Sequence, residues 1–198
     1  MARSTPRRTS GGPVLQDDVT AAIEAAYFAE LADVGYGRLS LEAVARRAGV
    51  GKAAIYRRWK SKLDLSVALL SETAVAAIDV PDSGDLRTDT AQYLRNMRDA
   101  LSTTTVARIA TDVLAEAHRS PELAAVLADK VRDPRRVKAA AIFDRAIDRG
   151  EIAANCDTEF AMDLLAGPLT WRLLVLREPV DDSYCDRLAD SVVTTLAM

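Results

Sequence analysis

The sequence has few of the residues that mark several classes of protein, and each shortage excludes something. It holds 2 cysteines, and Cys156 and Cys185 lie far apart in no CxxC spacing, which excludes a disulfide framework and a cysteine zinc site. The single histidine, His118, argues against a histidine-rich metal centre. We therefore expect no metal, no cofactor and a reducing, cytoplasmic location.

Glycine and proline, which interrupt helices most strongly, are also scarce, at 9 and 7 residues, whereas alanine is abundant. This composition predicts an all-α fold. No stretch approaches the roughly 20 apolar residues that span a bilayer. The basic N-terminus is not followed by the apolar core of a secretion signal, so we expect neither export nor a membrane partner.

Catalytic patterns are missing as well. No nucleophile–base arrangement, phosphate-binding loop or pair of acid–base carboxylates stands out, and the acidic residues scatter along predicted solvent faces. We therefore predict no catalytic residues and no enzyme activity.

Charge is divided unevenly along the chain, although the net charge is only −3. Residues 1–62 hold 11 Lys and Arg against 6 Asp and Glu, whereas residues 63–198 hold 15 against 23. A basic N-terminal part on an acidic remainder predicts that only the N-terminal part meets a polyanion such as DNA.

The pattern of apolar residues predicts three regions. Residues 1–13 are a basic arm expected to be disordered, either solvated or in contact with DNA; residues 14–62 form a DNA-binding domain; residues 63–198 form a larger helical domain. About nine helices are predicted, at 16–34, 40–48, 52–59, 61–80, 87–102, 104–118, 121–149, 157–177 and 181–197. Pro134 is expected to kink or split the seventh.

Two short helices with a tight turn between them form a helix-turn-helix pattern in the N-terminal domain. Ser40 is a suitable N-cap, and Gly49 supplies a turn with positive φ. Ile55 and Trp59, spaced i and i+4, are the clear core residues of the second helix, whose other face is basic. A short helix with small residues at its start can enter a major groove.

This segment resembles the TetR/AcrR family of bacterial transcriptional regulators. The residues that carry the resemblance are Ala45, Ala48, Gly49, Val50, Gly51, Ile55, Tyr56, Trp59, Ser61, Lys62 and Leu65. Gly51 stands where a serine or threonine cap is common, and Trp59 where phenylalanine is common. The resemblance implies a homodimer that binds a palindromic operator in double-stranded DNA and releases it when a small-molecule effector occupies the C-terminal domain.

The same resemblance implies a set of DNA-contacting residues. Tyr56 and Lys62 match positions that contact phosphates, and Lys52, Ala53 and Arg57 match positions that read bases. Arg58 and Lys60 are expected at the DNA backbone, and Arg47 either there or in a surface salt bridge. The predicted set is Ser40, Arg47, Gly51, Lys52, Ala53, Tyr56, Arg57, Arg58, Lys60 and Lys62.

The last two predicted helices are expected to form a four-helix dimer interface with their symmetry mates. The alternative is that the helix at 157–177 is the buried centre of the C-terminal domain. The predicted interface residues are Leu165, Gly167, Leu169, Leu173, Tyr184, Leu188 and Val192.

An effector pocket is expected among the helices of the C-terminal domain, although ordinary core is the favoured interpretation for each of its residues taken singly, and for His118 the alternative is a surface position. The predicted lining is Tyr93, Met97, Ile109, His118, Phe143, Phe160 and Trp171. The predicted function is a ligand-responsive repressor. The alternatives are a DNA-binding protein whose C-terminal domain only dimerises, and a ligand-responsive activator.

Overall fold

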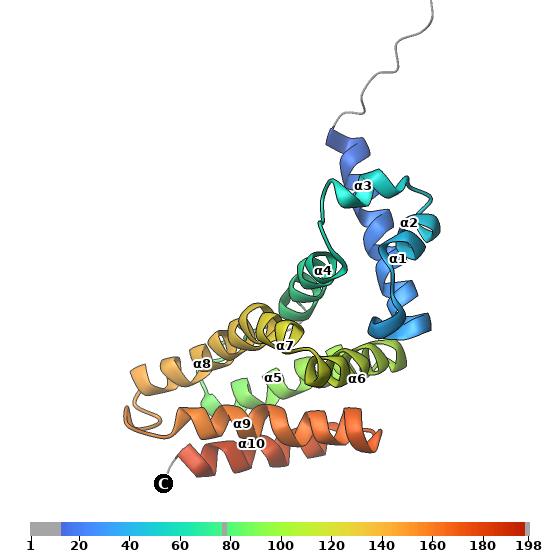
Figure 1. The fold of residues 1–198 in the computed structure, drawn as a ribbon. Helices are drawn as coiled ribbons and strands as arrows, with labels where there is room; N and C mark the ends of the chain where they lie inside the picture. Colours follow the sequence, from blue (N-terminus) through green and yellow to red (C-terminus); the bar gives the residue numbers. More distant parts are fainter. Residues whose placement is uncertain (1–12, 77–78, 197–198) are drawn as a thin grey trace, which may run out of the picture. The chain divides into compact units, whose positions relative to one another are not determined.

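The computed structural model describes residues 13–76 and 79–196, so residues 1–12 of the predicted arm lie outside the described residues. The chain divides into two compact units (Figure 1). We call Met1–Lys62 the head and Leu63–Met198 the body.

In its described residues the chain forms nine continuous helical segments and no strand, which confirms the predicted fold class. They are α1 (Pro13–Arg38), α2 (Leu41–Arg47), α3 (Lys52–Tyr56), α4 (Lys62–Ala76), α5 (Leu86–Leu101), α6 (Thr104–Arg119), α7 (Pro121–Leu127) joined through the π-helical segment η1 (Ala128–Arg132) to α8 (Asp133–Asp148), α9 (Thr158–Thr170) continued by the π-helical η2 (Trp171–Leu176), and α10 (Asp182–Leu196). Within the described residues, no helix is both long enough and apolar enough to cross a membrane.

In the head, α1 packs against α2, and α2 packs against α3. The buried side chains of the three helices form its core, and the largest of them are Ile23, Tyr27, Leu31, Val44 and Ile55. α1 bends at Gly35, whose φ of 77° and ψ of 165° are not helical, and one more turn follows. The predicted helix end at Val34 corresponds to this bend, which glycine can adopt because it has no Cβ.

In the body, α5, α8, α9 and α10 enclose one core, and α9 and α10 run side by side (Figure 1). Four side chains that were predicted at the dimer interface lie in this core instead, with 9% of their surface or less exposed: Leu165, Leu169, Leu188 and Val192. They are covered by helices of their own chain, so they are not available to a partner. This corrects the predicted interface.

Of the two outcomes predicted at Pro134, a kinked or a split helix, the split is corrected, because the chain stays helical from Pro121 to Asp148. The turn before the proline widens into η1, and the backbone N–H of Asp133 donates to the carbonyl of Ala128. A proline ring clashes with the carbonyl four residues earlier and offers no N–H in return. A π-helical turn, with its i→i+5 hydrogen bonds, accommodates both effects without ending the helix.

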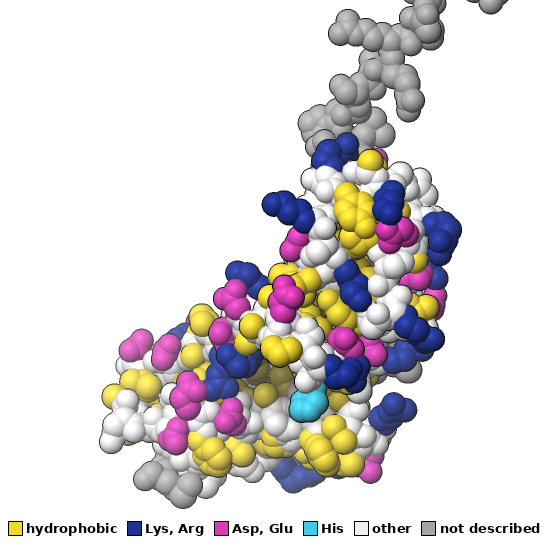
Figure 2. Space-filling view, viewed as in Figure 1, with side chains coloured by type: hydrophobic (Ala, Val, Ile, Leu, Met, Phe, Trp, Pro, Cys, Tyr) yellow, Lys and Arg dark blue, Asp and Glu magenta, His cyan; other side chains and the backbone are white. Residues whose placement is uncertain are grey.

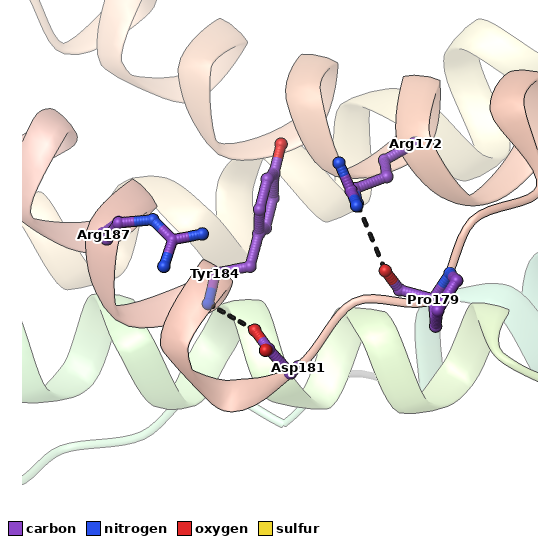
Figure 3. Close-up of a pocket in the computed structure, with 5 residues that line it drawn as sticks. All are labelled: Arg172, Pro179, Asp181, Tyr184 and Arg187. Atoms are coloured by element: carbon purple, nitrogen blue, oxygen red, sulfur yellow. Dashed lines mark hydrogen bonds between the residues drawn. The ribbon is translucent and has the colours of Figure 1, made fainter.

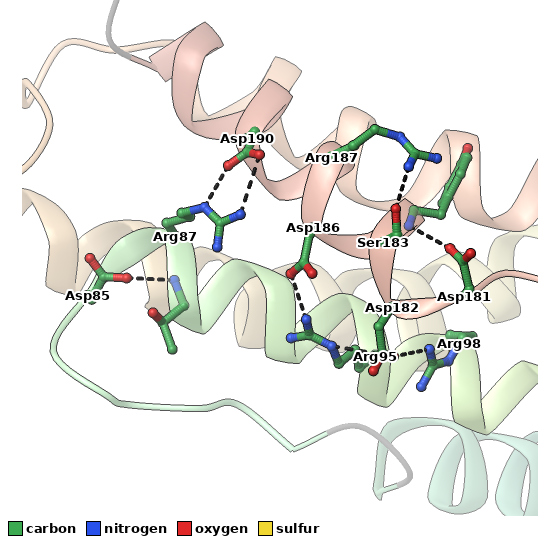
Figure 4. A network of polar contacts seen from close by, with 12 residues as sticks. Asp85, Arg87, Arg95, Arg98, Asp181, Asp182, Ser183, Asp186, Arg187 and Asp190 are labelled. Atoms are coloured by element: carbon green, nitrogen blue, oxygen red, sulfur yellow. Dashed lines mark hydrogen bonds and ion pairs between the residues drawn. The ribbon is translucent and has the colours of Figure 1, made fainter.

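Ion pairs join α5 to α10 along their exposed edge (Figure 4). Three aspartates at intervals of four residues on α10 accept from three arginines on α5, at 2.6, 2.6 and 2.5 Å: Arg87–Asp190, Arg95–Asp186 and Arg98–Asp182. The hydrogen bond from Arg98 holds the pKa of the Asp182 carboxyl below its usual value. The three aspartates keep 37–67% of their side-chain surface exposed, although Arg95 and Arg98 are mostly covered, so we expect each pair to align the two helices more than it stabilises them.

Leu169→Ala tests the assignment of this leucine to the core. It should lower the free energy of unfolding by about 2–5 kcal/mol, because a fully buried side chain leaves a cavity. Leu114→Ala, which removes the same atoms from a side chain that is 59% exposed, should change it by less than about 0.5 kcal/mol. Urea unfolding followed by circular dichroism compares the two, and equal effects would contradict the assignment.

Candidate nucleic-acid interface

The helix-turn-helix begins with a side-chain cap. The hydroxyl oxygen of Ser40 accepts from the backbone N–H of Ala43 at 3.2 Å, which satisfies one of the unpaired donors at the start of α2. After α2, Gly49 has φ 67°, as predicted for the turn. Together the cap and the turn set the direction in which the chain enters α3.

α3 has a single buried side chain, that of Ile55, which is fully enclosed. Lys52, Ala53 and Tyr56 are exposed, and so is Arg57 at the C-cap. Gly51 precedes the helix, and a Cβ added there would meet nothing within 4 Å, so the backbone is open to a close approach. The predicted base-reading residues are therefore accessible from outside the protein.

Glu42, in the first turn of α2, contacts two residues of this surface. Its Oε1 forms an ion pair with Lys52 Nζ and accepts from the Tyr56 hydroxyl at 3.2 Å. Lys52 Nζ also lies 5.4 Å from the centre of the Tyr56 ring. The hydrogen bond from Lys52 lowers the pKa of the Glu42 carboxyl, and the same bond raises the pKa of Lys52.

The arginines around α3 differ in their contacts. Among the residues that the structure describes, Arg57 forms no hydrogen bond or ion pair, so its guanidinium is available to a ligand. Arg58 donates to the carbonyl of Ala54 at 3.2 Å, at the C-terminal end of α3. Lys60 follows α3 and is exposed. Figure 2 shows Lys and Arg side chains spread over the head with acidic side chains among them.

Two residues of the predicted set are engaged within the head. Arg47 pairs with Asp33 at 2.6 Å and with Glu30 at 3.1 Å, both on α1, and the bond to Asp33 raises its pKa. This favours the predicted alternative, a surface salt bridge. Lys62 Nζ donates to the carbonyl of Tyr36 at 2.9 Å and lies 4.4 Å from the centre of its ring. Lys62 therefore holds the turn that follows the bend in α1, a role that its motif position did not indicate.

The predicted effector pocket is not assembled as one site. Tyr93, Met97, Ile109 and Phe143 are buried, but the other three predicted residues, His118, Phe160 and Trp171, are exposed. An exposed aromatic ring does not line an interior cavity of its own chain, so these three are corrected. Within the described residues, no cluster of histidine, cysteine or carboxylate side chains is suited to a metal ion.

Two polar side chains of the body, the buried Tyr93 and the half-buried Arg135, interact with each other electrostatically. Burial raises the pKa of the Tyr93 hydroxyl and lowers the pKa of Arg135 on α8. Each group moderates the other's shift through their opposite charges. They are chemically able to orient a polar ligand, which sequence patterns missed because Arg135 resembles any surface arginine.

Several exposed residues of α9 and η2 share one face. Gly167 and Trp171 follow Phe160 by seven and eleven residues, which are close to two and three helical turns. Phe160, Trp171 and Val175 expose 52, 57 and 56% of their surface. We call Phe160, Gly167, Trp171 and Val175 the α9 face; of these only Gly167 belonged to the predicted interface.

A shallow pocket of about 330 Å³ lies between η2 and the start of α10 (Figure 3). The guanidinium carbons of Arg172 and Arg187 lie 5.1 and 5.8 Å from the centre of the Tyr184 ring. Tyr184 and Leu173, both predicted at the dimer interface, are half-buried and pack against the body core. Tyr184 is therefore shared between the core and this surface.

Models of two protein families match the chain. Residues 23–69 match the model described as bacterial regulatory proteins, tetR family, and residues 80–192 match the tetracyclin repressor-like C-terminal domain. The second match alone covers more than half of the chain.

Individual transcriptional regulators are similar to this chain as well. The DNA-binding transcriptional repressor TetR of Mycobacteroides abscessus is 34% identical over 166 residues, which are 82% of this chain and 85% of that protein. The uncharacterized HTH-type transcriptional regulator Mb1581 of Mycobacterium bovis is 33% identical over 167 residues, 82% of this chain and 80% of its own. The crystal structure of the TetR family transcription regulator SCO0332 is 30% identical, with a TM-score of 0.68, and covers 91% of this chain and 100% of its own.

Lys62→Ala tests the contact that Lys62 makes within the head. It should lower the free energy of unfolding by about 1–2 kcal/mol, because the charged hydrogen bond to the carbonyl of Tyr36 is lost. Arg57→Ala, which removes a cation with no partner among the described residues, is the control and should leave stability within about 0.5 kcal/mol. Unfolding in urea measures both; a Lys62 variant as stable as wild type would refute the contact's role.

Proposed function

This chain belongs to the tetR family of bacterial regulatory proteins, and we propose that it represses transcription as a homodimer that binds a palindromic operator and releases it when a small-molecule effector binds the body. The resemblance found at the helix-turn-helix is confirmed by the family models and relatives. The chain is accordingly a DNA-binding transcriptional regulator. The proposal adds the dimer, the effector, the direction of regulation and the contacting residues.

The observation that carries the DNA contact is the exposure of one side of α3. Ile55 is fully buried, while Lys52, Tyr56 and Arg57 are exposed. Arginine can make two parallel hydrogen bonds to the edge of a guanine, whereas a lysine or a phenol suits a phosphate oxygen. We therefore propose Arg57 as the base-reading residue and Lys52 and Tyr56 as contacts to the phosphate backbone.

The size of this surface supports the proposed homodimer. α3 is five residues long, and one such helix contacts too few bases to select a site. Two copies related by a two-fold axis would double the site and make it palindromic.

We propose the α9 face as the surface through which two copies meet. Its exposed aromatic and aliphatic side chains would be shielded from water by a second copy of the same face. Gly167 lies between Phe160 and Trp171 along the helix and leaves room for close approach, since a Cβ there would meet nothing within 4 Å. Arg172 and Arg187, beside Tyr184, would form a polar rim.

An effector site in the body is supported by the family model that residues 80–192 match and by the buried Tyr93 with the half-buried Arg135. A buried neutral phenol and a half-buried guanidinium would favour a ligand that brings a hydrogen-bond acceptor. Thermal-shift screening tests this part, because a ligand that binds the native state raises the melting temperature.

Arg57→Ala tests base recognition. Selection of bound DNA from a random pool should give a palindromic site with wild type. The variant should bind that site about 1–3 kcal/mol more weakly and lose preference at one position in each half-site. Arg38→Ala, which removes an exposed arginine at the C-terminal end of α1, is the control. Selected sites without two-fold symmetry would contradict the dimeric operator, and an unchanged preference would contradict the role of Arg57.

Trp171→Asp tests the α9 face. A charge placed in an apolar interface should shift the chain from dimer to monomer in size-exclusion chromatography with light scattering, and should weaken operator binding through the lost second head. Val137→Asp puts the same charge on a side chain of α8 that is 72% exposed and should leave the dimer intact. A wild-type chain that is monomeric throughout would refute the dimer, and a dimeric Trp171 variant would refute this interface.

A further inference from the structure

Glu42 is an acidic side chain within the proposed DNA-facing surface, where it contacts Lys52 and Tyr56. The DNA contact proposed above gives it no role. A carboxylate beside a phosphate backbone is repelled by it, so its presence needs a reason. We propose that Glu42 competes with DNA phosphates for Lys52 and Tyr56, and thereby holds the affinity of the head for DNA of any sequence below what its basic residues would otherwise give. The inference rests on the DNA-binding surface of the proposed function.

The contacts show that the competition is direct. One oxygen of Glu42, Oε1, receives both the ammonium of Lys52 and the hydroxyl of Tyr56. Those are the two donors of α3 that suit a phosphate oxygen. The hydrogen bond to Lys52 lowers the pKa of Glu42, so the carboxylate stays charged at neutral pH and the pair is present whenever DNA arrives.

The pair is exposed, which decides how strong the competition is. The side chains of Lys52 and Glu42 keep 60% and 49% of their surface accessible. An ion pair this exposed adds little to folding stability, so holding the head together does not account for it. The Lys52–Glu42 ion pair is weak enough for a DNA phosphate to displace the carboxylate. It is also strong enough that breaking it reduces the free energy gained from the new contact between Lys52 and the phosphate.

The local sequence supports an effect on α3 rather than on the head as a whole. Glu42 precedes the buried Ala43 and Val44 of α2 and points away from the core. Arg57, the proposed base-reading residue, is outside the Glu42 contacts. Glu42 therefore acts on the sequence-independent part of binding and leaves base recognition unchanged.

Glu42→Gln in the full chain is the test, because glutamine keeps the shape and removes the charge. The probe is a fluorescently labelled duplex of mixed sequence, titrated by anisotropy over a series of salt concentrations. We expect the variant to bind about twofold to fivefold more tightly than wild type at low salt, which is the range of an exposed ion pair. The slope of the logarithm of the DNA association constant against the logarithm of the salt concentration should steepen by up to about 0.9 per head. In wild type, Lys52 only exchanges the Glu42 carboxylate for a DNA phosphate, whereas in the variant it neutralises an additional phosphate.

Glu24→Gln is the matched control. It removes the same charge from α1 in the same head, and its smaller effect measures the general change in electrostatic attraction. A second comparison places Glu42→Gln in a Lys52→Ala, Tyr56→Phe background, where its gain should fall to that of Glu24→Gln because the competing donors are gone. Melting temperatures confirm that each variant is folded.

The possible outcomes distinguish a failure of the proposed Glu42 competition from a failure of the proposed DNA binding. A Glu42→Gln gain no greater than that of Glu24→Gln, or one that persists without Lys52 and Tyr56, would overturn the competition. Weaker binding by Glu42→Gln would overturn it too, and would show that the carboxylate contacts DNA, as a glutamate does with the amino group of cytosine. A wild-type chain that binds no duplex would refute the DNA-binding surface instead.

Discussion

The burial of Ile55 is the constraint on which the DNA-facing surface depends. A helix of five residues is not stable by itself in water, so α3 holds its shape only because this side chain fills a place in the core of the head. With Ile55 directed inward, the helical spacing turns Lys52, Ala53 and Tyr56 outward. The Ser40 cap and the positive φ of Gly49 fix where the helix begins.

Those local features are why the head was well predicted from its sequence. The Ser40 cap and the left-handed Gly49 depend on residues a few positions apart, and the structure has both; of the predicted core pair Ile55 and Trp59, Ile55 is buried, whereas Trp59 follows α3 and is half-buried. The contacts of Lys62 and Arg47 were not predictable in this way. Lys62 reaches carbonyls 25 and 26 residues earlier, and Arg47 reaches an aspartate 14 residues earlier. No spacing rule indicates which long cationic side chain turns inward.

The body shows a different limit. The segment 157–177 is apolar around most of its circumference, so periodicity cannot say which side faces the core. The prediction placed Leu165 and Leu169 outside, and the structure places them inside with Phe160 and Trp171 exposed. The π-helical segments η1 and η2 contribute as well, since a wider turn shifts the phase of every residue that follows. The helices themselves were predicted because chain breaks at Gly150, Pro121 and the 81–85 loop are local.

The Glu42 contacts have a consequence for how such a regulator finds its site in a genome. A chromosome presents about 10⁶ or more wrong sites for each right one, and time spent on them delays arrival. A head whose lysine already has an anionic neighbour loses little on leaving any stretch of DNA, so each wrong encounter is brief. Residence at the operator then depends on base contacts made by other residues. The Glu42 carboxylate thus favours a fast search for the operator over long residence on DNA of other sequence.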